Sequence, residues 1–280
     1  MPDPRPIGIF DSGIGGLTVL RALRHRLPSE SFLYLGDTAR LPYGTKSPDT
    51  IQRYARQAAS LLLSRNVKAI VIACNTASAA ALDDLRCLPV PVLGVVEPGA
   101  AAACRASRSG RIAVLSTEAT ARSRAYEAAI RAINPSAQVT PIACPLLVSL
   151  AEEGWTDGPV PEAVVRRYLE PHLHRADSAD CFVLGCTHFP LLKYAIQNIV
   201  GPWPLIDSGA AAAADAESIL DSNNLRAPAA QSARVQLLVT DGPERFARLA
   251  ALLFGAPIHE SQIELVDLSE TPEATIAPAA

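Results

Sequence analysis

Residues 69–76, AIVIACNT, and residues 181–188, CFVLGCTH, decide the fold predicted for this chain. In each stretch a short apolar run ends in a cysteine, Cys74 or Cys186, that polar residues follow. The length of the runs and their Ile and Val content are typical of buried parallel strands, and a helix-like segment follows each one. Because groups just past the carboxyl ends of parallel strands line the ligand crevice, we expect both thiols at the mouth of one sheet or of two facing sheets.

Strand-like and helix-like segments alternate along the chain, which predicts an α/β fold with mostly parallel sheets flanked by helices. The expected strands are 6–10, 32–36, 68–73, 91–95, 111–115, 137–142, 180–185, 204–209, 234–239 and 262–267. The expected helices include 15–27, 48–64, 75–86, 119–132, 161–175, 210–221 and 243–254. Residues 97–99, which read Glu-Pro-Gly, are expected to break the pattern ahead of an Ala-rich helix.

The pattern restarts near residue 111. Strand 111–115 ends in Ser116 and Thr117, much as the first strand ends in Asp11 and Ser12. The interval from Asp11 to Cys74 is 63 residues, and the interval from Ser116 to Cys186 is 70 residues. This weak internal repeat favours two similar lobes.

Composition narrows the class of protein. The 280 residues suit one large or two smaller α/β domains, and 49% apolar residues supply a sizeable core. The net charge of −3 and the lack of a basic cluster argue against a nucleic-acid partner. No run approaches the ~18 apolar residues that a membrane span needs, and the N-terminus lacks signal-peptide features. Six scattered cysteines then imply reduced thiols in the cytoplasm.

The loop from Asp11 to Gly16, DSGIGG, has two interpretations. It is either a tight turn with a helix cap or an anion cradle of free backbone N–H groups. Its glycine spacing differs from the dinucleotide fingerprint. A second loop, with Pro42, Tyr43 and Gly44, follows the next strand on the same side of the sheet, which favours contact with a substrate.

The two strand-end cysteines stand apart from the other four. Free cysteine is commonly a small buried hydrophobe, and we expect that of Cys87, Cys104, Cys144 and Cys181. Cys74 and Cys186 instead end strands at helix N-termini, where the helix dipole favours the thiolate. No fourth ligand accompanies the cysteines and His188, so we predict no metal site. Lys193 lies inside a helix past the site, so pyridoxal phosphate is not expected either.

These motifs together resemble those of the glutamate racemases. The matching strings are GIFDSGIGGLTVL (8–20), LGDTARLPYG (35–44), ACNTAS (73–78), GVVEPG (94–99), STEAT (116–120), CPLLVSLAEEG (144–154), LGCTHFPLL (184–192) and IDSG (206–209). The resemblance implies a cofactor-independent isomerase that interconverts L- and D-glutamate and supplies D-glutamate for peptidoglycan. It also implies two α/β lobes with the active site in the cleft between them and one cysteine on each lobe.

The expected first lobe is 1–97 plus 208–268, the second is 98–207, and 269–280 is expected to be a disordered tail. By resemblance, the catalytic residues are Cys74, Cys186, Asp11, His188 and Glu152. Contacts with the substrate are expected from Asp11, Ser12, Pro42, Tyr43, Gly44, Asn75, Thr76, Thr117, Thr120, Thr187 and His188. The sequence does not fix the oligomeric state and leaves a homodimer open.

Inversion at Cα needs a base on one face of the carbon and an acid on the other. A free thiol has a pKa of roughly 8.5, so one cysteine must be activated. A carboxylate beside a thiol raises the pKa of that thiol, so Asp11 can assist only by accepting a proton or orienting partners. His188, as an imidazolium, can stabilise a thiolate. The two sulfurs are expected roughly 6–9 Å apart, on either side of one Cα.

Three alternatives stay open at this point. The first is a related racemase for aspartate or another amino acid, which PYG (42–44) and GCTHFPLL (185–192) disfavour. The second is a non-catalytic amino-acid-binding or inhibitor protein, which retention of both thiols disfavours. The third is a cysteine hydrolase, which should need only one nucleophile and an oxyanion hole.

Overall fold

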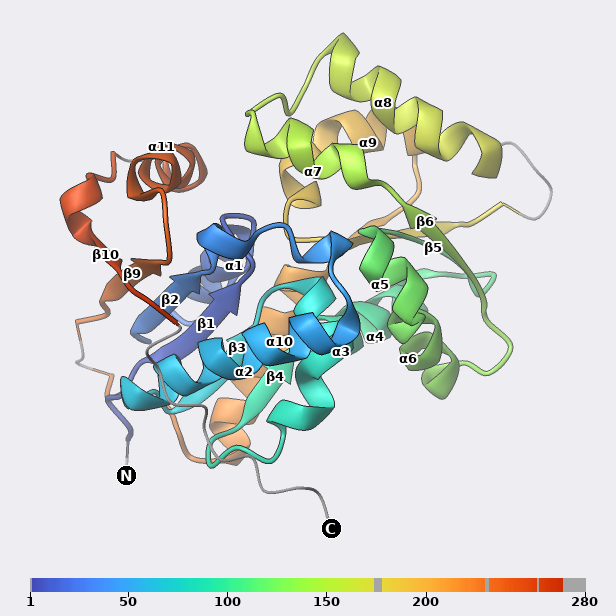
Figure 1. Cartoon of the computed structure of the whole chain (residues 1–280). Helices are drawn as coiled ribbons and strands as arrows, with labels where there is room; N and C mark the ends of the chain where they lie inside the picture. Colours follow the sequence, from blue (N-terminus) through green and yellow to red (C-terminus); the bar gives the residue numbers. More distant parts are fainter. Residues whose placement is uncertain (1, 174–177, 230–231, 256, 269–280) are drawn as a thin grey trace.

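The computed structural model describes residues 2–173, 178–229, 232–255 and 257–268. It contains two all-parallel sheets (Figure 1). The first has the strand order β10-β9-β2-β1-β3-β4, and the second has the order β6-β5-β7-β8. The strands are β1 (Ile7–Asp11), β2 (Phe32–Gly36), β3 (Ala69–Ile72), β4 (Val92–Gly94), β5 (Arg111–Ser116), β6 (Gln138–Ala143), β7 (Cys181–Gly185), β8 (Leu205–Asp207), β9 (Val235–Val239) and β10 (Ile263–Leu265).

The two sheets repeat one arrangement, β2-β1-β3-β4 in the first and β6-β5-β7-β8 in the second. Asp11 ends β1, and Ser116 ends β5 at the equivalent position of the other sheet. Cys74 follows β3, and Cys186 follows β7. The strand order therefore accounts for the weak repeat in the sequence.

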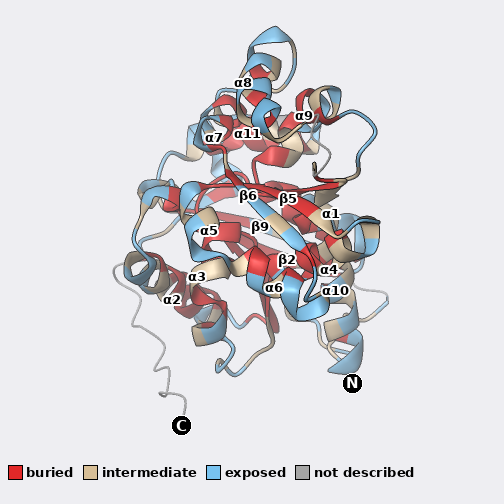
Figure 2. Ribbon diagram, turned by 90° about the vertical axis from the view of Figure 1, so that its right-hand side faces the viewer, coloured by how far each residue is buried: buried red, intermediate tan, exposed pale blue. Residues whose placement is uncertain are grey.

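Helices cover both faces of each sheet. They are α1 (Leu17–Arg26), α2 (Pro48–Ser64), α3 (Asn75–Leu85), α4 (Val96–Ala106), α5 (Glu118–Ser123), α6 (Ala125–Ile133), α7 (Pro145–Glu152), α8 (Pro159–Leu169), α9 (Lys193–Val200), α10 (Ser208–Ser222) and α11 (Pro243–Phe254). Apolar residues of α1, α10 and α11 pack on one face of the first sheet, and those of α2 and α3 pack on the other. In the second lobe, α4 and α6 pack on one face of the sheet, and α7, α8 and α9 pack on the other. Figure 2 shows the strands largely buried, except β6 at the edge.

The chain crosses between the sheets at two neighbouring points. α4 follows β4 of the first sheet, yet Val96, Ala100 and Ala103 pack against the second. α10 follows β8 of the second sheet, yet Ala212 and Ala213 pack in the core of the first. The fold class predicted from the sequence, two α/β lobes with parallel sheets, is confirmed. The lobe boundaries at 97 and 208 stay predictions.

Several element predictions were wrong in detail. The helix expected at 119–132 is two helices, because Arg124 takes a left-handed conformation with φ 56° and ends α5. Residues 97–99 do not precede a helix but lie in the first turn of α4, where proline is tolerated because no N–H there needs an intrahelical partner. The helix expected at 161–175 is α8 followed by a 3₁₀ turn at Glu170–His172, and residues 174–177 lie outside the described residues.

At the end of β8, the strand expected to run to residue 209 stops at Asp207, whose carboxylate caps α10 by accepting from the N–H groups of Gly209 and Ala210. The tail 269–280 lies outside the described residues. Within the described part of the chain, no helix is both long and apolar enough to cross a membrane.

Candidate active site

Asp11 and Cys74 lie side by side at the carboxyl end of the first sheet. Asp11 is fully buried, and its carboxylate accepts hydrogen bonds from the Gly13 N–H at 2.9 Å and from the Thr187 hydroxyl of the second lobe at 3.3 Å. Burial raises the pKa of Asp11, against the opposing effects of His188 and of the backbone N–H groups of Gly16 and Gly13. The first loop therefore delivers a buried carboxyl group to the boundary between the lobes.

Cys74 caps the N-terminus of α3. Its sulfur accepts from the Ala77 N–H at 3.4 Å, and its thiol donates to the Ser12 hydroxyl at 3.7 Å. Burial, followed by the charge of Asp11, raises the pKa of Cys74 to about 12. The N–H of Ala77 at the N-terminus of α3 lowers the pKa of Cys74, as expected there, but burial and the charge of Asp11 outweigh this contribution.

Cys186 has a different environment, built on the second lobe. Its sulfur lies 3.8 Å from Nδ1 of His188, and Nε2 of His188 lies 3.2 Å from Oε1 of Glu152, at the end of α7. Burial would lower the pKa of His188, but the contacts with Cys186 and Glu152 outweigh it and raise the pKa to about 10. A protonated His188 beside Cys186 is suited to stabilising a thiolate.

The two lobes meet closely around His188. A Cβ atom built on Gly15 would stand 2.6 Å from Nδ1 of His188. The Thr18 hydroxyl, one turn further along, donates to the Thr187 carbonyl at 3.0 Å. The loops that follow β1 and β7 thus fit together only because residue 15 has no side chain.

Three threonine hydroxyls from both lobes meet on the other side of the site. Thr76 lies 2.9 Å from Thr117 and 3.1 Å from Thr120, and Thr117 and Thr120 are 3.0 Å apart. All three side chains are buried. A Cβ on Gly44 would stand 2.7 Å from the Cβ of Thr117, so the second loop of the first lobe closes over this cluster. The cluster offers several hydroxyl donors at one place.

Asn75 is held by residues of the second lobe and of the crossing at α10. The Tyr126 hydroxyl donates to Oδ1 of Asn75 at 2.6 Å, and Nδ2 donates to the Ser208 hydroxyl at 3.4 Å. Ser208 in turn donates to the carbonyl of Leu184 in β7 at 3.2 Å. The amide next to Cys74 is therefore fixed from the opposite lobe.

Tyr43, expected to contact the substrate, lies in the loop that follows β2. It is buried, and its hydroxyl donates to the buried carboxylate of Asp37, which also accepts from Arg40 at 2.7 Å and from Thr240 at 3.0 Å. Its ring packs against Tyr54, with 5.5 Å between the ring centroids. Tyr43 lies between Pro42 and Gly44, so its contacts with Asp37 and Tyr54 fix the position of this loop.

Both strand-end cysteines are free thiols and only 5% exposed. The predicted separation of 6–9 Å stays a prediction. Among the other four, Cys144 and Cys181 are buried as expected and Cys104 is half-buried, but Cys87 is exposed at the end of α3. The described residues contain no group of three or more His, Cys, Asp or Glu that could hold a metal ion.

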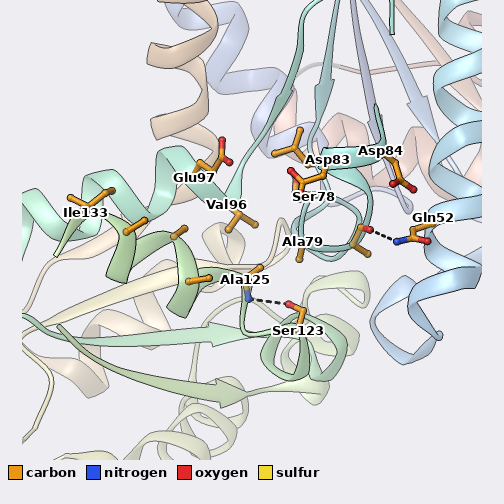
Figure 3. A pocket seen from close by; sticks show the side chains of 15 residues that line it. Gln52, Ser78, Ala79, Asp83, Asp84, Val96, Glu97, Ser123, Ala125 and Ile133 are labelled. Carbon is orange, nitrogen blue, oxygen red and sulfur yellow. Dashed lines mark hydrogen bonds between the residues drawn. The ribbon is translucent and has the colours of Figure 1, made fainter. Parts of the chain in front are cut away.

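Two hollows flank this region. A cavity of about 280 Å³ is lined by Glu152 and His188 from the second lobe, by Gly15 from the first, and by Leu249 and Leu253 of α11. A larger groove of about 740 Å³ lies between α3, α4 and α6 (Figure 3). The carboxylates of Asp83, Asp84 and Glu97 line one part of it and Ile133 another. None of the predicted site residues lines the larger groove, so it is separate from the thiols.

Sequence reasoning missed three residues that contact the predicted site. Tyr126 and Ser208 bind Asn75, and Arg245 binds Glu152 with 3.1 Å between Nη2 and Oε2. Each lies far along the chain from its partner and on a helix, where the sequence shows only ordinary helical composition. Of the three, only Ser208 lies in a motif quoted above, the string IDSG (206–209), which could have pointed to the site.

Comparison with known proteins identifies the class. The sequence model of the Asp/Glu/Hydantoin racemase family matches residues 17–216. The glutamate racemase of Geobacter metallireducens is 47% identical over 91% of this chain and 94% of its own length.

Among solved structures, the glutamate racemase of Francisella tularensis in complex with D-glutamate is 38% identical and has a TM-score of 0.87, covering 95% of this chain and 98% of that one. That of Thermus thermophilus in complex with beta-chloro-D-alanine is 44% identical and has a TM-score of 0.85, covering 96% and 99%. Fold and relatives thus define an isomerase of the amino-acid racemase class. The chain belongs to the Asp/Glu/Hydantoin racemase family, as the motifs predicted.

Proposed function

We propose that this chain is a cofactor-independent glutamate racemase in which Cys74 and Cys186 act on opposite faces of Cα. The observation that carries the proposal is the equivalence of the two thiols, which follow corresponding strands of the two sheets and are both buried. Each has a polar partner on its own lobe, the Ser12 hydroxyl for Cys74 and the His188 imidazole for Cys186. Glutamate is the proposed substrate because the relatives named above are glutamate racemases and one of them holds D-glutamate.

The substrate carboxylate needs preorganised donors, because without a cofactor the developing carbanion has little resonance stabilisation. We assign this role to donors near the thiols: the hydroxyl cluster of Thr76, Thr117 and Thr120, and the loops at Ser12, Asn75 and Thr187. Pro42 and Gly44 would shape the side of the site next to Thr117.

We assign the two cysteines different roles in one direction of the reaction. Cys74, with its raised pKa, is the proton donor, and Cys186, beside the protonated His188, is the base. The Cys186 thiolate takes the proton from Cα of one enantiomer, and the electron pair of the broken C–H bond remains on Cα. The Cys74 thiol then protonates the opposite face, which leaves a thiolate at Cys74 and a thiol at Cys186, ready for the reverse reaction. When Cys74 instead acts as the base on the other enantiomer, its thiol proton passes first to Asp11, and in both directions Glu152 orients His188.

The burial of both thiols requires the lobes to part for the substrate to enter, so closure excludes water during proton transfer. D-Glutamate produced in this way would supply peptidoglycan synthesis. The six free cysteines fit a reducing cytoplasmic location.

Exchange in D2O tests the proposal. The purified protein, incubated separately with L- and D-glutamate, is expected to form the opposite enantiomer and to introduce deuterium at Cα from either side, followed by NMR and chiral chromatography. A binding protein or a cysteine hydrolase would introduce none. If deuterium enters Cα of aspartate faster than Cα of glutamate, the chain is instead a racemase for aspartate.

A further inference from the structure

We propose that Arg245, on α11, is a positioning residue for the Cys186–His188 pair: it binds Glu152 across the two lobes and holds that carboxylate against His188. This inference rests on the proposed function and extends it to the C-terminal part of the chain. Arg245 lies outside residues 17–216, the part that the family model matches.

A continuous line of contacts joins Arg245 to the thiol. Its Nη2 lies 3.1 Å from Oε2 of Glu152. The other carboxylate oxygen, Oε1, lies 3.2 Å from Nε2 of His188, whose Nδ1 lies 3.8 Å from the sulfur of Cys186. Each oxygen of Glu152 therefore has its own cationic partner. Because both oxygens are engaged, the carboxylate cannot rotate without breaking one of the two contacts.

The arginine belongs to the first lobe, and the group it binds belongs to the second. Phe246, the next residue, is buried in the core of the first sheet, and its ring centroid is 5.9 Å from that of Tyr34. The Tyr34 hydroxyl donates to the carbonyl of Gly13, in the loop that also binds Asp11. In Figure 1, α11 lies with β9 and β10 of the first sheet, whereas α7 lies among the elements of the second. The ion pair is thus an inter-lobe contact that forms only when the lobes meet.

Charge explains what the contact does. Burial would raise the pKa of Glu152, and the net pKa is lowered because His188 and Arg245 outweigh burial. His188 faces Cys186 on its own loop, Glu152 from α7 and Asp11 from β1. Arg245 is thus a cation that favours the Glu152 carboxylate without binding the thiol or the imidazole. Glu153, the next residue along, has its Oε1 3.7 Å from Nη2 of Arg245, but the carboxylate that contacts His188 is that of Glu152.

The ion pair between Arg245 and Glu152 is not expected to stabilise the fold by much. Arg245 is 48% exposed, and ion pairs at such sites contribute little to stability. Loss of the guanidinium should therefore leave the unfolding temperature nearly unchanged. Its effect should appear in the proton transfer that Cys186 performs.

Kinetic isotope effects measured on Arg245→Gln report on the proton transfer between Cα and Cys186. The two enantiomers have equal free energy, so kcat/KM falls by the same factor in both directions, about two- to fivefold from the range for exposed pairs. The primary isotope effect with 2-deuterated glutamate should rise for the enantiomer that Cys186 deprotonates and fall for the other. The acid limb of the kcat/KM profile should move to higher pH, because Glu152 loses a cation. Arg245→Lys, which keeps the charge, should restore all three values.

Two neighbours serve as controls. Arg248, on the same helix, is exposed and forms no ion pair with any described residue, so Arg248→Gln should behave as wild type. Glu153→Gln should do the same. Isotope effects and pH profile unchanged in Arg245→Gln, or changed equally in Arg248→Gln, would overturn the inference. A wild-type protein that leaves glutamate unlabelled refutes the proposed function itself, whereas an active wild type matched by Arg245→Gln refutes only the role of Arg245.

Discussion

Gly15 of the first lobe lies directly against His188 of the second, so that a Cβ atom on Gly15 would come within 2.6 Å of Nδ1. It would come closer still to the hydroxyl of Thr187. The backbone of Gly15 has no positive φ, so the requirement for glycine here is one of space and not of conformation. Since Nδ1 faces Cys186, the position of Gly15 limits where the imidazole can stand.

Replacing Gly15 with alanine should therefore impair catalysis more than folding. The added methyl must push either the His188 ring or the whole loop, which displaces the partner of Cys186. A displacement of about 1 Å costs up to roughly 100-fold in rate, so we expect kcat/KM to fall roughly 10- to 100-fold. Racemisation kinetics and thermal unfolding, measured on the same preparation, check this.

Gly13→Ala is the matched control in the same loop. A Cβ there would meet its nearest atom, Cδ2 of Leu41, at 3.6 Å, an ordinary contact. It should keep most of the activity. Equal losses in the two variants would mean that the loop, and not the contact with His188, is sensitive.

Serine in place of either strand-end cysteine should remove nearly all racemisation. A serine hydroxyl ionises far less readily than a thiol, and loss of one acid–base group typically costs roughly 10²- to 10⁴-fold. Cys104→Ser, at a half-buried position away from both loops, should stay active. Circular dichroism distinguishes lost chemistry from lost folding. Full activity in Cys74→Ser or Cys186→Ser would contradict the two-base assignment.

The raised pKa of His188 predicts how stability depends on pH. The value rises from 6.5 to about 10 in the folded protein, so the folded state binds the proton more tightly than the unfolded chain. The stabilisation is complete below about pH 6.5 and is lost as the pH rises towards 10. Wild type should thus lose more stability than His188→Asn between these limits. Parallel curves for the two proteins, from denaturant titrations at each pH, would refute the shift.

The sequence predicted the fold because each strand-end motif is local. The cysteines, the threonines at 76 and 187 and the DSG loop follow strands directly, so the parallel topology alone brings them to one edge of each sheet. The ends of α2 and α11 were also predicted to the residue, from Pro48 to Ser64 and from Pro243 to Phe254.

The features of the site that the sequence did not predict depend on contacts between segments that are distant along the chain. The burial of Tyr43 comes from Asp37 and the packing of Tyr54, neither of which a turn-like string reveals. The thiol pKa of Cys74 depends on how completely the facing lobe removes water, and composition carries no information about that. Arg245 meets Glu152 across 93 residues of chain, on a helix whose charges look like those of any solvated face.

Tyr126 offers the sharpest test of how the second lobe holds the amide next to Cys74. Its buried hydroxyl donates to Oδ1 of Asn75. Without it, the contact that remains to that oxygen within the described part of the chain is the Ser208 hydroxyl at 3.5 Å. Leaving a buried acceptor poorly satisfied costs about 1–3 kcal/mol, so Tyr126→Phe should lower the free energy of unfolding by that amount. The freed amide should also bind the substrate less well, which raises KM more than it lowers kcat. Tyr194→Phe, at a site 80% exposed, is the control and should change neither quantity. Unaltered KM in a destabilised Tyr126→Phe protein would show that the hydroxyl supports the fold and leaves Asn75 in position.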